Sequence, residues 1–188
     1  MSWIWGGVGV LGVLLGGFFW WQGQQSAGGF EALIAQGKPG LQARVLTHAD
    51  AGRGHINIGT PVQYATDPPT SGVHWPNWTN PGFYERPEPK EKLVHALEHG
   101  NVVIYYDRPP TEALNQVRSW QRLFTGQWDG LVVVPRQGLG QALELTAWNR
   151  LLRLETWDAV VGGGFCRCLP GPGAGEPGAM KFSGVIMT

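Results

Sequence analysis

The sequence predicts an α+β domain of two layers, with a small mixed sheet and flanking helices, preceded by one N-terminal transmembrane helix. Its 188 residues are enough for one domain with a hydrophobic core and a short appendage. From residue 89 onward, segments typical of helices and strands follow one another as helix, strand, helix, strand, strand, helix. That order is typical of an α+β domain. Near the N-terminus, a run of apolar residues is long enough to cross a bilayer.

The apolar run is WIWGGVGVLGVLLGGFFWW, residues 3–21, and it contains no charged side chain and no side-chain amide. As a helix it would extend about 28 Å, close to the roughly 30 Å of a bilayer core. Tryptophans stand in pairs at its two ends, where indole rings favour the membrane interface. We therefore expect residues 1–21 to be a single-pass anchor in the cell membrane, with the following domain on the extracytoplasmic side. A cleaved signal peptide is the alternative, but no Lys or Arg precedes Lys38.

The rest of the chain divides into three parts. Residues 22–40 are rich in Gln, Gly and Ser, and we expect a stalk in which FEALIAQG makes two helical turns ending at Gly37. The globular domain is expected over residues 41–165. It begins with a short strand in ARVLTHAD, followed by a loop containing several glycines. Residues 166–188 form a Pro- and Gly-rich tail without the pattern of a regular element.

A long irregular segment runs from Pro61 to Pro89 and contains seven prolines. Within it we expect only one short strand, VQYA, at residues 62–65. A run of this length without regular structure inside a compact domain is more often functional than not.

The next three segments predict a helix, a strand and a helix. PKEKLVHALEHG has the pattern of a helix of about three turns that stops at Gly100. NVVIYY is rich in β-branched and aromatic residues, which predicts a buried strand. In PPTEALNQVRSWQRLF a threonine follows two prolines and apolar residues recur on one face, as expected for a capped amphipathic helix.

Two strands and a helix complete the domain. GLVVVPR predicts a second buried strand, and QALELTAWNRLLRLE predicts a third that bends near Trp148. TWDAVVGGGF predicts a closing helix that is broken by three glycines.

The charge balance excludes one class of partner. Lys and Arg together number 14, as do Asp and Glu, so the formal net charge is zero. Electrostatic capture of nucleic acid needs a strong basic excess. Nucleic acid is therefore excluded as a partner.

The histidines carry the strongest chemical signal. His95 and His99 lie four residues apart on a predicted helix, which places both side chains on one face with Cβ atoms about 6 Å apart. His74, in the irregular segment, and His55, beside glycines in GRGHI, are the third and fourth candidate ligands. Three or four imidazoles suit copper, zinc or iron, and intrinsic affinity favours Cu(II). We expect a metal ion here, copper first and zinc next. The alternative is that these are structural histidines beside a core.

An enzymatic interpretation rests on HALEH, which matches the pattern H-x-x-E-H. In that pattern two histidines bind zinc and the glutamate activates a water molecule. Glu98 would then be the catalytic base of a zinc-dependent hydrolase. Alternatively, Glu98 accepts a hydrogen bond from a ligand imidazole and so orients the ring. A five-residue pattern arises often by chance, so we expect metal binding rather than catalysis.

Sulfur ligands are weaker candidates. Cys166 and Cys168 are separated by one residue, a spacing at which two thiolates can hold Cu(I) or Zn(II) but a disulfide would be strained. Met180 is a further candidate thioether ligand for Cu(I). Two incidental cysteines in a flexible tail are the alternative.

The stretches PPTSGVHWPNW, GFY and LVHALEHGNVVIYY resemble the signature of a family of membrane-anchored prokaryotic proteins known as domain of unknown function 3105. The resemblance covers about half of the chain. It implies an N-terminal anchor with one extracytoplasmic domain, and it places His55, His74 and the residues from His95 to Gly100 in the family pattern. No established activity comes with it. The chain departs from the family at GGGFCRCLPGPGAG, where the resemblance leads us to expect a longer final helix.

Three functional hypotheses follow. The first is a membrane-anchored, extracytoplasmic metal-binding protein that handles copper or exchanges it with a donor or acceptor protein. The second is a zinc-dependent hydrolase that uses the HALEH motif. The third is a non-catalytic interaction module of the cell envelope whose histidines are structural.

Overall fold

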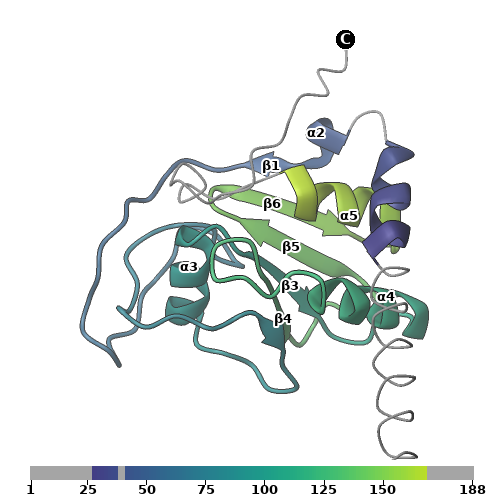
Figure 1. Cartoon of the computed structure of the whole chain (residues 1–188). Helices are drawn as coiled ribbons and strands as arrows, with labels where there is room; N and C mark the ends of the chain where they lie inside the picture. The colour runs from purple at the N-terminus through teal and green to yellow at the C-terminus, as the bar shows by residue number, and fades with distance from the viewer. Residues whose placement is uncertain (1–26, 38–40, 169–188) are drawn as a thin grey trace, which may run out of the picture.

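The computed structural model describes residues 27–37 and 41–168, and they form one mixed six-stranded sheet with helices around it (Figure 1). The strands lie in the order β1-β6-β5-β3-β4-β2. Their bounds are β1 Leu46–Thr47, β2 Gly82–Phe83, β3 Val102–Tyr106, β4 Leu131–Pro135, β5 Leu143–Ala147 and β6 Arg150–Leu154. β3 is parallel to β4, and β4 is parallel to β2, whereas the pairs β3–β5, β5–β6 and β6–β1 are antiparallel.

The helices are α2 Leu41–Arg44, α3 Lys90–Glu98, α4 Thr111–Gln121 and α5 Ala159–Cys168, and residues 27–35 are helical as well. α4 connects the parallel strands β3 and β4, as a crossover helix must. It buries Ala113, Val117 and Trp120, the face that the sequence pattern predicts. α3 is followed by Gly100 at φ 98°, a left-handed conformation that favours glycine and ends the helix there.

Both faces of the sheet are covered, so the domain has three layers where two were expected. On one face, Ile104, Val133 and Leu145 pack with α4, α5 and the helical segment 27–35. On the other face, Val103 and Val132 pack with α3. Figure 1 shows α3 at the left of the view and α4 and α5 at the right. The physical reason is that β3 and β4 are apolar at every position, and such strands need cover on both sides.

The α+β class and the mixed sheet are confirmed, but several local expectations are wrong. Residues 62–65 form no strand. Instead, the Val62 N–H donates to Glu91 Oε1 at 3.0 Å, and the Tyr64 hydroxyl donates to the Val73 carbonyl at 2.9 Å. Residues 141–155 form the hairpin β5–β6 rather than one bent strand. The chain reverses at Trp148 and Asn149, and Asn149 adopts φ 60°, which asparagine tolerates better than most residues.

The three consecutive glycines do not break the last helix, and α5 continues to Cys168. A Cβ atom at Gly162 would lie 3.0 Å from the Trp157 ring, and one at Gly164 would lie 2.9 Å from Leu41 Cδ2. The glycines therefore allow close packing of α5 against its neighbours.

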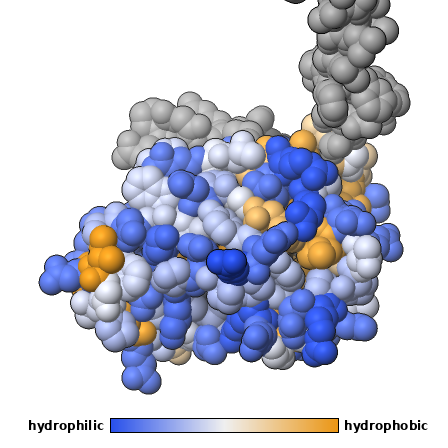
Figure 2. All heavy atoms as spheres, turned by 90° about the horizontal axis from the view of Figure 1, so that it is seen from below, coloured by the Kyte–Doolittle hydropathy of each residue, from blue (hydrophilic) through white to orange (hydrophobic). Residues whose placement is uncertain are grey.

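The surface is mostly polar. The face drawn in Figure 2 is largely hydrophilic, with hydrophobic residues gathered in a few separate patches. In the described part of the chain, the large hydrophobic side chains that are exposed are Leu46, Ile58, Val73 and Trp128. No helix within residues 27–37 and 41–168 is both long and apolar enough to cross a bilayer. The predicted anchor, residues 1–21, lies outside the described residues.

Candidate metal centre

Two loop segments and one helix build the site. The loops around His55 and His74 run side by side in a short parallel bridge. In this bridge the His74 N–H donates to the Gly54 carbonyl, and the Ile56 N–H donates to the His74 carbonyl, both at 2.9 Å. α3 adds His95 and Glu98. The irregular segment is therefore held by backbone pairing at the position where it delivers a histidine.

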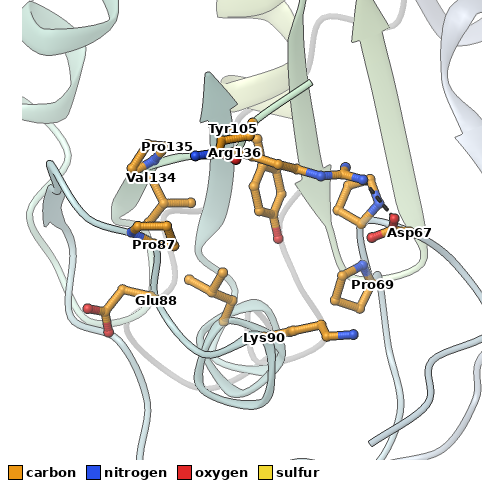
Figure 3. A pocket seen from close by; sticks show the side chains of 12 residues that line it. Asp67, Pro69, Pro87, Glu88, Lys90, Tyr105, Val134, Pro135 and Arg136 are labelled. Atoms are coloured by element: carbon orange, nitrogen blue, oxygen red, sulfur yellow. Dashed lines mark hydrogen bonds and ion pairs between the residues drawn. The ribbon is translucent and has the colours of Figure 1, made fainter. Parts of the chain in front are cut away.

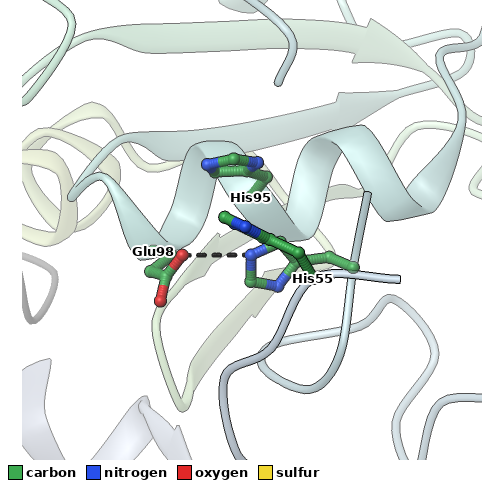
Figure 4. A group of neighbouring side chains, drawn as sticks. His55, His95 and Glu98 are labelled. Carbon is green, nitrogen blue, oxygen red and sulfur yellow. Dashed lines mark hydrogen bonds and ion pairs between the residues drawn. The ribbon is translucent and has the colours of Figure 1, made fainter. Parts of the chain in front are cut away.

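Four side chains converge at this point (Figure 4). His55, His74, His95 and Glu98 each offer one ligand atom, and these four atoms all lie within 4.8 Å of one another. The three imidazole rings contact each other, with centroids separated by 5.2 Å for His55 and His74, 4.9 Å for His55 and His95, and 4.7 Å for His74 and His95. Imidazole nitrogens and a carboxylate oxygen are the usual ligands of zinc and copper.

Backbone carbonyls determine the proton positions on two of these rings. Nδ1 of His95 lies 2.7 Å from the Trp75 carbonyl oxygen, and Nδ1 of His74 lies 2.8 Å from the Gly72 carbonyl oxygen. A carbonyl oxygen only accepts, so both Nδ1 atoms carry a proton and donate. In the neutral ring, Nε2 then has the free lone pair. Metal-binding histidines commonly use their second nitrogen in this way.

The contact between His74 and Glu98 indicates a place for positive charge. His74 Nε2 lies 3.0 Å from Glu98 Oε2. If Nδ1 holds the only proton of the ring, both of these atoms are acceptors, and they can approach this closely only with a cation or a second proton between them. The His74 side chain is fully buried, whereas the Glu98 side chain is 26% exposed. A cation bound by both atoms would avoid burying an imidazolium.

Burial also keeps the site's central imidazole neutral. Burial, with a smaller contribution from the neighbouring histidines, lowers the pKa of His95 to about 4, although the hydrogen bond to the Trp75 carbonyl opposes the shift. At neutral pH the ring is therefore uncharged, as a metal ligand must be. His55 differs because it is exposed. The group is closed on the side of α3 and open on the side of His55.

His99 is the predicted ligand that the structure does not bring into this group. Its ring lies between Trp78 and Trp128, with both centroids 4.6 Å from that of His99. Burial lowers its pKa, and its Nδ1 has no hydrogen-bond partner among the described residues.

The helical geometry explains why Glu98 takes the place of His99. Successive residues of an α-helix are turned by about 100°, so Glu98 lies about 60° to one side of His95 and His99 about 40° to the other. His74 contacts the side of Glu98, and the tryptophans occupy the side of His99. The HALEH motif includes Glu98, so the sequence did indicate this residue as a candidate. Its spacing alone could not show whether Glu98 or His99 joins the group.

The sulfur candidates lie elsewhere or outside the described residues. Cys166 is on α5 and packs against the core on the sheet face opposite α3. Burial raises the pKa of its thiol to about 12, which disfavours the thiolate that a metal needs. The side chain of Cys168, and the whole of Met180, lie outside the part that the structure describes.

Comparison with known proteins gives one match. The model of a family described as protein of unknown function (DUF3105) matches residues 55–179. The matched range begins at His55 and includes every member of the histidine and glutamate group. No curated protein and no solved structure matches the chain.

Proposed function

Because the chain belongs to the DUF3105 family, whose function is unknown, its role has to be inferred from the site, and we propose that it binds a metal ion. The resemblance that the sequence signature indicated is thereby confirmed. In the full proposal, the protein is anchored in the membrane, carries copper on the extracytoplasmic side and exchanges it with a donor or acceptor protein.

The observation that carries the proposal is the convergence of four ligand atoms within 4.8 Å. Two of them come from rings whose Nδ1–H groups are held by backbone carbonyls. Such contacts fix the orientation of a ligand ring before the metal arrives and lower the cost of ordering it. A histidine that only fills space in a core needs no such convergence.

The donor set favours a divalent ion. Three imidazoles and a carboxylate suit Cu(II) and Zn(II), whereas Cu(I) prefers thiolate and thioether ligands. At equal availability, Cu(II) binds such a set more tightly than Zn(II). We therefore place copper first and zinc second. The exposed ring of His55 supports exchange with a partner, because an incoming ligand can reach the ion from that side.

The hydrolase alternative is not favoured by the geometry. The pattern H-x-x-E-H requires both of its histidines on one zinc ion, with the glutamate free to act as a base. Here Glu98 lies within the group of ligand atoms, and His99 packs between two tryptophans instead. We propose binding and no catalysis.

A matched pair of variants tests the proposal. His95→Ala removes a ligand, and His99→Ala removes a neighbouring buried histidine that lies outside the group. Each protein is incubated with excess Cu(II) or Zn(II), dialysed, and measured by inductively coupled plasma mass spectrometry. We expect about one ion per chain in the wild type and in His99→Ala, and a loss of at least about tenfold in affinity in His95→Ala.

Two results would overturn the proposal. One is a wild-type chain that retains neither metal after dialysis. The other is equal retention by the wild type and His95→Ala. In either case the histidines are structural, which is the interaction-module hypothesis. To decide between copper and zinc, the wild type is incubated with Cu(II) and Zn(II) at equal concentration, and the metal that it retains after dialysis is measured in the same way.

A further inference from the structure

His55 differs from the other candidate histidine ligands in how its side chain is held. It is exposed, whereas His74 and His95 are 0% and 4% exposed. The His55 ring contacts the other two rings, but its nitrogens form no hydrogen bond with any residue in 27–37 or 41–168. By contrast, Nδ1 of His74 and Nδ1 of His95 each donate to a backbone carbonyl. His55 is therefore the histidine that leaves the group at the least cost.

The backbone that carries His55 is fixed, so its side chain can move alone. The Ile56 N–H donates to the His74 carbonyl at 2.9 Å. Further along the same loop, the Trp75 indole N–H donates to the Thr60 carbonyl at 2.8 Å. Departure of the ring needs only rotation about its side-chain bonds, which exposed residues undergo within nanoseconds.

The other ligands are held from the opposite side. Figure 4 shows His55 reaching the group from a loop, whereas His95 and Glu98 extend from α3. α3 is packed on the sheet by its buried apolar residues, and Glu98 Oε2 lies 3.0 Å from His74 Nε2. His74, His95 and Glu98 therefore form a set that stays in place when His55 moves.

The cavity beside the N-terminal end of α3 offers no second route to the ion (Figure 3). Its volume is about 420 Å³, and Pro69, Pro87 and Tyr105 of β3 are among the residues that line it. No candidate ligand lines this cavity. A partner therefore reaches the group from the exposed side of His55.

The surface on that side carries no charge of its own. The segments that pair at His55, residues 54–66 and 68–84, contain no Lys, Arg, Asp or Glu. Arg53, which precedes the first segment, is paired with Asp50 at 3.6 Å. Such a surface does not steer a charged protein toward the site.

We propose that His55 is the exchange ligand of the metal centre, and that the ion passes to or from a partner protein when a histidine of that partner takes the place of His55. His74, His95 and Glu98 hold the ion while the bond to the His55 nitrogen breaks and the bond to the incoming imidazole forms. The donor set remains three imidazoles and one carboxylate, so its preference for Cu(II) or Zn(II) is unchanged at this step. The partner is not selected by charge. The inference rests on the proposed function, because it needs a bound ion.

The first test uses the full-length protein and Cu(II), with free imidazole as the probe for the partner's side chain. His55→Ala and His95→Ala each remove one imidazole from the group, the first exposed and the second buried. We expect each variant to bind Cu(II) at least about tenfold more weakly than the wild type. Saturating imidazole should restore the affinity of His55→Ala to within about threefold of the wild type, because the vacated position is open to solvent. It should not restore His95→Ala, where that position is enclosed.

The second test measures how fast the copper-loaded wild type passes its ion to peptides that each carry one histidine, followed by the visible absorbance of Cu(II). Because the incoming imidazole takes part in the step, the rate should rise in proportion to the peptide concentration. A peptide with Asp residues beside its histidine and one with Lys residues should accept the ion at rates within about threefold of each other.

The outcomes separate this inference from the proposed function. A wild-type chain that retains no copper after dialysis overturns both. If copper is retained, the exchange role of His55 is overturned by failure of imidazole to restore His55→Ala, by equal restoration of both variants, or by a transfer rate that is independent of peptide concentration. A clear preference for the acidic or the basic peptide overturns recognition without charge. Because His55 is exposed, its replacement leaves the fold intact, and the test remains decisive even if His95→Ala folds poorly.

Discussion

At the scale of single residues, the Nδ1 contacts of His74 and His95 decide which ring nitrogen is available at the centre. Each Nδ1–H donates to a backbone carbonyl, so each Nε2 is the nitrogen that is free to bind a metal ion. The carbonyl that accepts from His95 belongs to Trp75, which lies 20 residues earlier in the chain and outside α3. Sequence spacing could indicate a pair of ligands but not the tautomer of either.

The lowered pKa of His95 predicts how stability depends on pH in the metal-free protein. The pKa is about 4 in the folded chain and about 6.5 in an unfolded one. Between these values the unfolded state binds more protons, so the stabilisation is complete above about pH 6.5 and is lost as the pH falls through about 4. With a chelator present, we expect a lower melting temperature at about pH 5 than at about pH 7, measured by circular dichroism.

His95→Gln is the control for this prediction, because it removes the titrating group and keeps a polar side chain of similar size. The decrease in melting temperature between the two pH values should be smaller in the variant. An equal decrease in both proteins would show that other groups cause it.

Cys166, which is partly buried against the core, is predicted to have a thiol of low reactivity. Its pKa is raised by burial to about 12, so very little thiolate is present near neutral pH. In a Cys168→Ser variant, which keeps Cys166 as the chain's one thiol, reaction with Ellman's reagent at about pH 8 should be at least about 100-fold slower in the folded than in the unfolded protein. Equal rates in buffer and in guanidinium chloride would contradict the raised pKa of the Cys166 thiol.

At the scale of elements, α3 is the part of the fold that joins the metal centre to the sheet. Its Leu93, Val94 and Leu97 are buried on the sheet. Its last turn supplies His95 and Glu98 to the metal centre. One short helix, packed on the sheet by its apolar face, thus positions two of the four candidate ligands.

The start of β4 offers a test of how the sheet edge is assembled. A Cβ atom at Gly130 would overlap the Pro81 ring and the Gly126 carbonyl oxygen. Pro81 directly precedes β2, which pairs with β4. Since the backbone cannot move away cheaply, we expect Gly130→Ala to lower the free energy of unfolding by at least about 2 kcal/mol, measured by urea denaturation.

Gly126→Ala is a close comparison for this substitution. A Cβ atom there would meet the Asp129 carboxylate, the end of a side chain that can rotate aside. We expect a change of less than about 0.5 kcal/mol. Similar losses in the two variants would mean that the contact with Pro81 does not determine the packing of β2.

Among the strands, the long apolar runs could be predicted and the short ones could not. β3 and β4 are continuous runs of β-branched and aromatic residues, which is a strong local signal. β2 has two residues, and its pairing depends on the neighbouring strand rather than on any pattern of its own. The prediction of a strand at residues 62–65 is wrong: the Val62 N–H donates to Glu91 of α3, and Tyr64 packs against the cluster that contains α3, so the segment does not join the sheet.

At the scale of the whole molecule, the predicted anchor remains a proposal that fractionation can test. We expect the full-length protein to sediment with membranes and to resist extraction with alkaline carbonate, because about 20 apolar residues are enough to span a bilayer. Deletion of residues 1–26 should release the domain, as immunoblotting of the fractions would show. Release of the full-length protein by carbonate would contradict an anchor, and a mature chain that lacks the segment by mass spectrometry would indicate a cleaved signal peptide.

The sequence by itself determined the class of the fold, the order of its main elements apart from the β5–β6 hairpin, the family, and the candidates for metal binding among the histidines. These follow from local patterns, because apolar periodicity and residue type act over a few positions. Tertiary structure alone decided that helices cover both sheet faces, that Glu98 rather than His99 joins His55, His74 and His95, and that Tyr105 faces a cavity. Those outcomes depend on contacts between residues far apart in the chain, such as His74 with Glu98 and His95 with Trp75, and no local pattern contains them.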